Sequence, residues 1–263
     1  MARNFDGSGD IIDVPGASNA TIGTIAAWIK ADTLPPSTER DICWTYYLAS
    51  ESESFGTYDK ALFLRSSGIV VAYVYDGATK RVASTSAIST GTWYHIAMTF
   101  SNADDFRVWF NGVNEATTVL AGDSFSYLDP NFRLCGLTNT FDDGETTRSR
   151  LDGSIADLHI WTVVLNAEEV TQAMRGAIVR PHQQILWLPL WGITSPEPDW
   201  SGSNAHGTLT GTVRDDHPPG ISAVWLAPHP RQSQVVAAAA GQPSMRRWGG
   251  IPHMLTGQRG RTW

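Results

Sequence analysis

Short stretches of alternating apolar and polar residues, separated by turn residues, fill most of the first 160 positions and constrain the fold more than any other feature. In residues 92–100, every second side chain is apolar or aromatic, which is the period of a strand buried on one face. A polar turn leads into residues 106–110, and Asn111-Gly112 then supplies the backbone freedom of a tight turn. Residues 62–75 show the pattern of a second hairpin. Repeated hairpins predict an all-β, antiparallel sandwich.

One short helix is expected in this otherwise β-rich chain, over residues 166–175. Asn166 is a suitable N-cap, and Glu169 three positions later completes a capping box. Val170 and its neighbours one turn on provide a single apolar stripe. Gly176 suits the left-handed conformation that ends a helix. We expect this helix to cover one edge of the sheets.

Five segments resemble, as a set, the strands of laminin-G-like (concanavalin A-like lectin/glucanase) jelly-roll domains of the kind found in bacterial and phage proteins. They are residues 4–15, 24–30, 91–97, 108–112 and 151–161. The resemblance extends over roughly residues 3–176, and each segment alone is unspecific. It implies a jelly-roll β-sandwich with one short helix, over a domain that we place at residues 1–220.

A strand pair within residues 183–211 resembles the pair that precedes the opening strand in this family, although here it follows the helix. The chain therefore resembles a circularly permuted member of the family, which is feasible when the termini of a sandwich lie close together. The late strands could return to their own sandwich or complete the sheet of a neighbour. We favour the first, because a short connection within one chain costs less entropy.

The composition changes after residue 220, where an extended C-terminal arm is predicted over residues 221–263. The whole chain carries a net charge of −7, yet this arm contains five arginines and no acidic residue. Arginine and tryptophan commonly anchor interfaces, so we expect the arm to order on a partner. Nucleic acid is a less favoured partner, because five arginines on an otherwise acidic protein form only a weak basic surface. The predicted docking residues are Trp225, Arg246, Arg247, Trp248, Arg259, Arg261 and Trp263.

Catalytic chemistry is not expected. Glycosidases of related folds need a pair of carboxylates, and Glu51 and Glu53 have a suitable spacing only in a polar stretch typical of a loop. His95 and His159 are interpreted as packing or surface residues. The distant Cys43 and Cys135 match no metal-ligand spacing, and we interpret them as buried thiols; pairing requires that the fold bring them together.

Calcium is the one cofactor that the resemblance suggests, since many laminin-G-like domains bind it at the rim of the sandwich. Asp6, Asp10 and Asp157 match the acidic rim positions of that family and are the predicted metal ligands. A second acidic loop contains Asp142, Asp143 and Glu145. The alternative is that these residues are solvated turn residues, because aspartate favours turns.

A carbohydrate site is the other candidate, since sugars in this fold class stack on aromatic residues of loops. Residues 35–60 form a long polar insertion that contains aromatic side chains. The alternative is an extra strand at residues 42–49 whose aromatic residues are packed. The predicted carbohydrate-binding residues are Trp44, Tyr46, Tyr47 and Tyr58.

A laminin-G-like chain with this permuted order and an arginine- and tryptophan-containing arm resembles phage structural proteins. The resemblance implies a non-enzymatic virion structural protein of a phage, a capsid decoration or fibre-like component with an outward sandwich and a docking arm. Its expected partners are capsid or other virion proteins and further copies of itself. The alternative is a carbohydrate-binding, lectin-like protein that recognises host or environmental glycans. No run of about 18 apolar residues predicts a membrane span. Because the first residues do not resemble a signal peptide, we expect synthesis in the host cytoplasm. The resemblance to phage structural proteins implies location on the virion surface.

Overall fold

The computed structural model describes residues 1–17, 22–35, 46–50, 60–75, 79–101, 105–119, 131–135, 150–191 and 194–219. Its elements, in chain order, are β1 (Ala2–Asp6), β2 (Ile11–Pro15), β3 (Gly23–Ala31), β4 (Tyr46–Ser50), β5 (Lys60–Leu64), β6 (Ile69–Tyr75), β7 (Thr79–Ala87), β8 (Tyr94–Phe100), β9 (Asp105–Phe110), β10 (Val113–Val119), β11 (Asn131–Leu134), β12 (Asp152–Trp161), α1 (Ala167–Met174), β13 (Gln184–Leu188), β14 (Thr208–Thr210) and β15 (Val213–Asp215). No described helix is long and apolar enough to cross a membrane.

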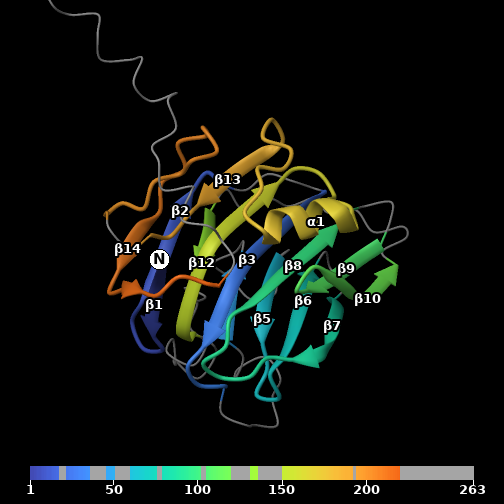
Figure 1. Cartoon of the computed structure of the whole chain (residues 1–263), viewed down its shortest axis with the longest axis horizontal. Helices are drawn as coiled ribbons and strands as arrows, with labels where there is room; N and C mark the ends of the chain where they lie inside the picture. Colours follow the sequence, from blue (N-terminus) through green and yellow to red (C-terminus); the bar gives the residue numbers. More distant parts are fainter. Residues whose placement is uncertain are drawn as a thin grey trace, which may run out of the picture. The chain divides into compact units, whose positions relative to one another are not determined.

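The described strands form two antiparallel sheets that face each other (Figure 1). Sheet A has the order β10-β9-β8-β3-β12-β1-β15, with β13 also paired to β12, and sheet B has the order β14-β2-β11-β4-β5-β6-β7. Strands β5 and β6 pair as the predicted hairpin, and β8 pairs with β9. The predicted all-β sandwich with one short helix is therefore confirmed.

The main core lies between the two sheets and follows directly from the alternation in the sequence. On β8, Ile96, Met98 and Phe100 are buried in this core, while Ala97 belongs to a separate cluster on the outer face of sheet A. On β12, Leu158 and Ile160 point into the core in the same way. Because successive side chains of a strand point to opposite faces, the residues between them form the outer face of sheet A. That face carries the helix and the candidate site.

The late strands pair with strands of the same chain, which is the arrangement that we favoured. Strand β13 pairs with β12 in sheet A, β14 with β2 in sheet B, and β15 with β1 in sheet A. The two predicted strands of residues 183–211 thus lie in different sheets and do not pair with each other. Strands β1 and β13 both pair with β12, β1 along residues 152–155 and β13 along residues 158–161. Circular permutation itself stays a prediction.

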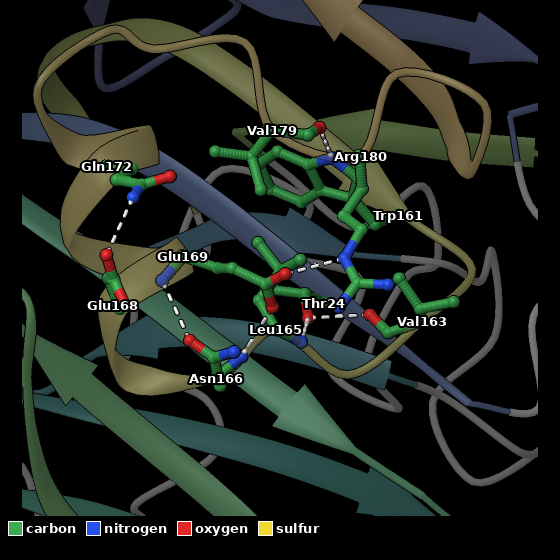
Figure 2. Close-up of polar contacts among 10 residues, drawn as sticks. All are labelled: Thr24, Trp161, Val163, Leu165, Asn166, Glu168, Glu169, Gln172, Val179 and Arg180. Atoms are coloured by element: carbon green, nitrogen blue, oxygen red, sulfur yellow. Dashed lines mark hydrogen bonds and ion pairs between the residues drawn. The ribbon is translucent and has the colours of Figure 1, made fainter.

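Helix α1 packs on the outer face of sheet A, where small side chains allow a close approach. Ala26 and Ala97 lie beneath it, in one buried cluster with Val170 of the helix. The predicted capping box is confirmed: the Asn166 side chain accepts the backbone N–H of Glu169, and the Glu169 carboxylate accepts the N–H of Asn166 (Figure 2).

The connections around α1 are fastened by side chains of the strands. The hydroxyl of Thr24 donates to the carbonyl of Val163 at 2.9 Å and accepts the N–H of Leu165, and the Trp161 indole donates to the carbonyl of Val179 (Figure 2). These bonds satisfy buried polar groups on both sides of the helix. The helix is therefore held to the sheet at its entry and its exit.

Candidate functional site

Five aromatic rings follow one another from the end of β12 across β13 to Trp191 and Trp200 beyond it, and we call them the aromatic row. Trp161 stacks on His159 with ring centroids 5.1 Å apart, and His159 stacks on Trp187 at 5.4 Å. Trp187 meets Trp200 edge to face at 5.8 Å, and Trp200 meets Trp191 in the same manner at 4.8 Å. Trp161 is fully buried, whereas Trp187, Trp191 and Trp200 are partly exposed. The row therefore leads from the core beside α1 to solvent.

Asp157 fixes the middle of this row from a strained position in β12. Its φ is +51°, where the regular pairing of β12 with β3 is interrupted, and its backbone N–H reaches the carbonyl of Pro189. Its Oδ1 accepts the indole N–H of Trp187 at 2.9 Å and lies 3.0 Å from Nε2 of His159. Gln184 contacts the other ring nitrogen of His159. One carboxylate oxygen thus sets the orientation of two neighbouring rings.

Asp199 fastens the loop that carries Trp200. Its carboxylate accepts the backbone N–H groups of Trp187, Ser201 and Ala205, and also the hydroxyl of Ser201. The backbone N–H of Trp200 donates to the carbonyl of Trp187 at 2.8 Å. Because an aspartate that accepts several backbone N–H groups stabilises a tight turn, Trp200 is held firmly beside β13.

Glu197 fastens Trp191 in a similar way. Its Oε1 accepts the backbone N–H of Trp191 at 2.9 Å, while Oε2 forms an ion pair with Arg3 at 2.9 Å. Both side chains of this pair are almost fully buried. The backbone of Glu197 forms a two-bond bridge with Gly207, and Arg3 also donates to the carbonyl of Thr194. The loop is thus tied to β1, at the far end of the sequence.

Burial and neighbouring groups together set the pKa values of Asp157 and His95. Burial alone would raise the pKa of Asp157, but the charge and hydrogen bond of His159 and the indole N–H of Trp187 hold it below its usual range. Burial lowers the pKa of His95 to about 3, so this imidazole is neutral at ordinary pH. His95 packs edge-on against Trp28 at 5.5 Å. Both His95 and His159 are buried, in agreement with the packing interpretation.

The opposite end of the same face carries a polar network, which comprises Lys30, Asp215, Ser154, Asn4 and Trp93. Lys30 Nζ lies 2.5 Å from Asp215 Oδ2, to which the Ser154 hydroxyl also donates. The Asn4 amide donates to Ser154, and the Lys30 ammonium lies 5.5 Å from the centre of the Trp93 ring. These contacts connect β3, β12, β1 and β15. Trp93 is partly exposed, like the outer rings of the aromatic row.

The structure places two of the three predicted calcium ligands, Asp6 and Asp10, in one turn, and Asp157 away from them. The Asp6 carboxylate accepts the backbone N–H and hydroxyl of Ser8, and Asp10 accepts the backbone N–H of Asp6. Asp6 pairs with Asp152, so Asp157 lies five residues further along β12, about 16 Å away. The carboxylates of Asp6 and Asp10 hold their own turn, which does not fit a calcium cage of six or more oxygens. Within the described ranges, no group of three or more metal-ligating residues is arranged around one point.

Several predicted positions cannot be compared with the structure. Tyr46 and Tyr47 lie on β4 of sheet B, and nothing is described of their side chains. Cys135 is a buried free thiol, in agreement with its interpretation. The predicted residues that lie outside the described residues are Cys43, Trp44, Glu51, Glu53, Tyr58, Asp142, Asp143, Glu145, Trp225, Arg246, Arg247, Trp248, Arg259, Arg261 and Trp263.

The partly exposed rings of the aromatic row were not among the site residues predicted from the sequence. Trp187, Trp191 and Trp200 were all present in the late segment, but that segment was interpreted only as strands. A signal did exist, because three tryptophans within 14 residues exceed what two short strands need. Asp199-Trp200-Ser201-Gly202 also has the composition of an aspartate-stabilised turn that presents an aromatic residue.

Comparisons with known proteins agree with this architecture. The sequence profile described as the concanavalin A-like lectin/glucanases superfamily matches residues 6–171. The pentraxin-related protein PTX3 of Mus musculus is 26% identical over 182 residues, which cover 64% of this chain and 42% of PTX3. The chain thus spans less than half the length of this curated relative.

Two solved structures share the fold. A candidate carbohydrate-binding protein from Bacteroides ovatus superposes with a TM-score of 0.60 at 21% identity, over 84% of this chain and 61% of that one. The heptameric SAP-like pentraxin of Limulus polyphemus superposes with a TM-score of 0.51 at 19% identity, over 67% of this chain and 83% of that one.

Proposed function

Because this chain belongs to the concanavalin A-like lectin/glucanases superfamily, we propose that it is a carbohydrate-binding protein whose ligand packs on the outer rings of the aromatic row. The observation that carries the proposal is the partial exposure of Trp191 and Trp200 on a loop fixed by Asp199 and Glu197. Indole rings offer a large apolar surface together with a polar N–H group. Sugars present matching C–H faces and hydroxyl groups.

The rigidity of the loop favours binding. A ring that is already held in place loses little conformational entropy when a ligand stacks on it, so more of the contact energy appears as affinity. The backbone of Trp200 is fixed by its bond to Trp187 and by the turn around Asp199, and its ring lies edge to face with the rings of Trp187 and Trp191. The Bacteroides ovatus protein, described as a candidate carbohydrate-binding protein, supports this choice at the level of the fold.

We propose binding without catalysis. The carboxylates that these contacts place along the aromatic row are Asp157, Asp199 and Glu197. Asp157 accepts from Trp187, Asp199 accepts four hydrogen bonds, and Glu197 is neutralised by Arg3. A glycosidase needs one carboxylic acid that can donate a proton and one carboxylate that can attack or activate water. Carboxylates engaged in this way serve the architecture of the loop instead.

The test is calorimetric titration of the full chain with a broad panel of soluble oligosaccharides, followed by the Trp200→Ala variant. We expect Trp200→Ala to weaken binding by roughly tenfold or more, which corresponds to a lost stacking contact. Trp93→Ala is the matched control, because Trp93 is a partly exposed tryptophan at the other end of the same face. Equal losses for both variants would place the site elsewhere, and a wild-type chain that binds no glycan would refute the proposal.

The virion role predicted from the sequence remains a second proposal, as do the virion surface location and the capsid partners. It depends on the resemblance and on the arm at residues 221–263, which lies outside the described residues. The Limulus pentraxin is described as heptameric, and self-association of this chain is likewise a proposal. Light scattering of the full chain, compared with a chain that ends at Gly220, would measure whether the arm drives assembly.

A further inference from the structure

The three partly exposed rings of the aromatic row, Trp187, Trp191 and Trp200, do not lie in one plane. The plane of Trp200 makes an angle of 70° with that of Trp191 and 64° with that of Trp187. The centroids of Trp191 and Trp200 are only 4.8 Å apart, so these two rings meet as the walls of a corner. They do not form a flat platform.

The loop holds the two rings at this angle, and bringing them into one plane would cost free energy. The backbone N–H of Trp191 is bound by Glu197, whose carboxylate is buried against Arg3. The backbone N–H of Trp200 is bound by Trp187 of β13. Rotating either ring into the plane of the other would break an edge-to-face contact within a well-anchored turn. The angle between the rings is therefore a property of the free protein.

The shape of the corner restricts the class of ligand. The face of an insoluble polysaccharide is flat over many sugar units, and it makes full contact only with rings that share one plane. Two rings that meet at a steep angle can both be contacted only by a small ligand that fits between their planes. A single sugar unit, at the end of a soluble chain or exposed on a glycan, has the dimensions to contact both rings.

The charges around the corner restrict the ligand further. Arg3 contacts Glu197, which binds the backbone of Trp191, and the Arg3 guanidinium is almost fully buried against Glu197 and the carbonyl of Thr194. On the side of Trp200, the Nδ1 of His206 is occupied by the backbone N–H of Asp199. Asp199 is likewise occupied by hydrogen bonds from its own loop. An acidic sugar would need an available cation to compensate the desolvation of its carboxylate. The corner is therefore suited to uncharged sugars.

We infer that the corner between Trp191 and Trp200 binds one uncharged sugar unit of a soluble glycan, and not the flat face of an insoluble polysaccharide. The inference rests on the proposed carbohydrate-binding function and specifies its ligand. In this arrangement both rings contact the same sugar unit, so their contributions to the binding free energy depend on each other. Removal of either ring should then abolish most of the binding, because the remaining ring holds the sugar from one side only.

The first experiment compares two kinds of probe with the full chain. Neutral oligosaccharides of two to four units are titrated by calorimetry, and microcrystalline cellulose and chitin are tested by sedimentation. We expect measurable affinity for one or more soluble probes and no depletion of the protein by the insoluble ones. Depletion by cellulose or chitin without soluble binding would overturn the inference and leave the proposed function standing. Binding of no probe, whether neutral, acidic or insoluble, would reject the proposed function itself. A marked preference for sialylated or uronic acid probes would also overturn the inference.

The second experiment is a double-mutant cycle on the soluble ligand. We expect Trp191→Ala and Trp200→Ala each to reduce the affinity by roughly tenfold or more, and the double variant to lose little beyond the stronger single variant. Independent, multiplying losses would show that the rings bind separate sugar units and would overturn the shared corner. Trp191→Phe and Trp200→Phe provide the fold control, since they preserve packing and should retain intermediate affinity. Thermal unfolding monitored by circular dichroism checks every variant.

Discussion

The two ends of the outer face of sheet A are built on the same strand, β12, yet they are held together by different forces. The aromatic row uses stacked rings anchored by Asp157 and Asp199, whereas the polar network joins Lys30, Asp215 and Ser154. The difference arises because β12 has two partners along one edge: β13 brings Trp187 to one end, and β1 with β15 brings polar groups to the other.

The aromatic row and the polar network both reach solvent, yet they differ in their suitability for binding a ligand. At the polar network, each functional group is committed to a neighbouring strand, and its contacts clamp β15 onto the sheet. At the aromatic row, the polar groups fix the backbone and leave part of the ring surfaces exposed. Fixed and partly exposed rings are suited to recognition, whereas a satisfied network is suited to stability.

The largest effect is expected at Gly153, where β12 approaches β3 at the end that carries the polar network. A Cβ at this position would lie 2.2 Å from the carbonyl oxygen of Lys30, at a φ of +152°. Gly153→Ala should therefore reduce the unfolding free energy by about 3 kcal/mol or more, because the two strands would have to separate.

Gly91→Ala is the control, since its Cβ would meet nothing within 4 Å and only its positive φ of +73° disfavours alanine. A cost near 1 kcal/mol is expected there. Urea unfolding of both variants makes the comparison, and equal losses would contradict the close approach.

A second effect depends on pH and on His95, which is buried between the two ends. Its pKa in the folded protein is about 3, compared with about 6.5 in an unfolded chain. The unfolded state therefore binds a proton that the folded state excludes, so stability is retained above pH 6.5 and lost as the pH falls toward 3. We expect the unfolding free energy to be about 2 kcal/mol lower at pH 4.5 than at pH 7 from this group alone. His95→Phe should have a shallower pH dependence over this window. An unchanged slope would show that His95 ionises freely.

The third prediction concerns Asp157, where backbone strain and the hydrogen bond of the carboxylate have opposite effects on stability. Glycine and asparagine tolerate a φ of +51° better than aspartate does, so a purely strained residue would be improved by either change. Asp157→Gly removes the acceptor for the Trp187 indole, and we expect a net loss of about 1–2 kcal/mol. Asp157→Asn keeps an acceptor and should cost less. The indole N–H resonance of Trp187 should shift strongly in the glycine variant. Stabilisation by glycine would show that the carboxylate does not position the ring.

The smallest effect is expected from the ion pair of the polar network. Burial opposes ionisation of Asp215, but the hydrogen bonds of Lys30 and Ser154 outweigh it, and its pKa is lowered. The pair therefore contributes above the unfolded pKa of about 4 and is lost as the pH falls below it. We expect Asp215→Asn to cost about 1 kcal/mol at pH 7 and nothing at pH 2. Glu169→Gln is a comparison at the more exposed pair with Arg180 (Figure 2). If Asp215→Asn lowers the unfolding free energy equally at pH 7 and pH 2, the effect arises from packing and not from the ion pair.

Local patterns predicted much of the fold. The alternation in residues 92–100 corresponds to β8, and the resemblance at residues 151–161 corresponds to β12. Asn166 and Glu169 predicted the start of α1 because a capping box involves four consecutive residues and depends on little else. In each case the relevant interactions lie within a few residues or follow from burial of one face.

The candidate site was not predictable in the same way. The aromatic row combines His159 of β12 with Trp200, 41 positions later, and the anchor of Trp191 depends on an ion pair between Glu197 and Arg3. Asp6 and Asp157 were predicted as ligands of one calcium ion, but the pairing of β1 with β12 places them far apart. Strand register decides these neighbours, and register is a property of the assembled sheet.

The sequence by itself determined the periodicity of the strands, the position of the helix and the class of fold, because these depend on local spacing and on which residues avoid water. Only the tertiary structure decided that β13, β14 and β15 join three different strands, that Asp157 faces His159 and Trp187, and that Trp191 and Trp200 meet at an angle. These arrangements require segments distant in the chain to find one register among several. The physical reason is that each strand has two hydrogen-bonding edges, and its own residues do not specify which other strands pair with them.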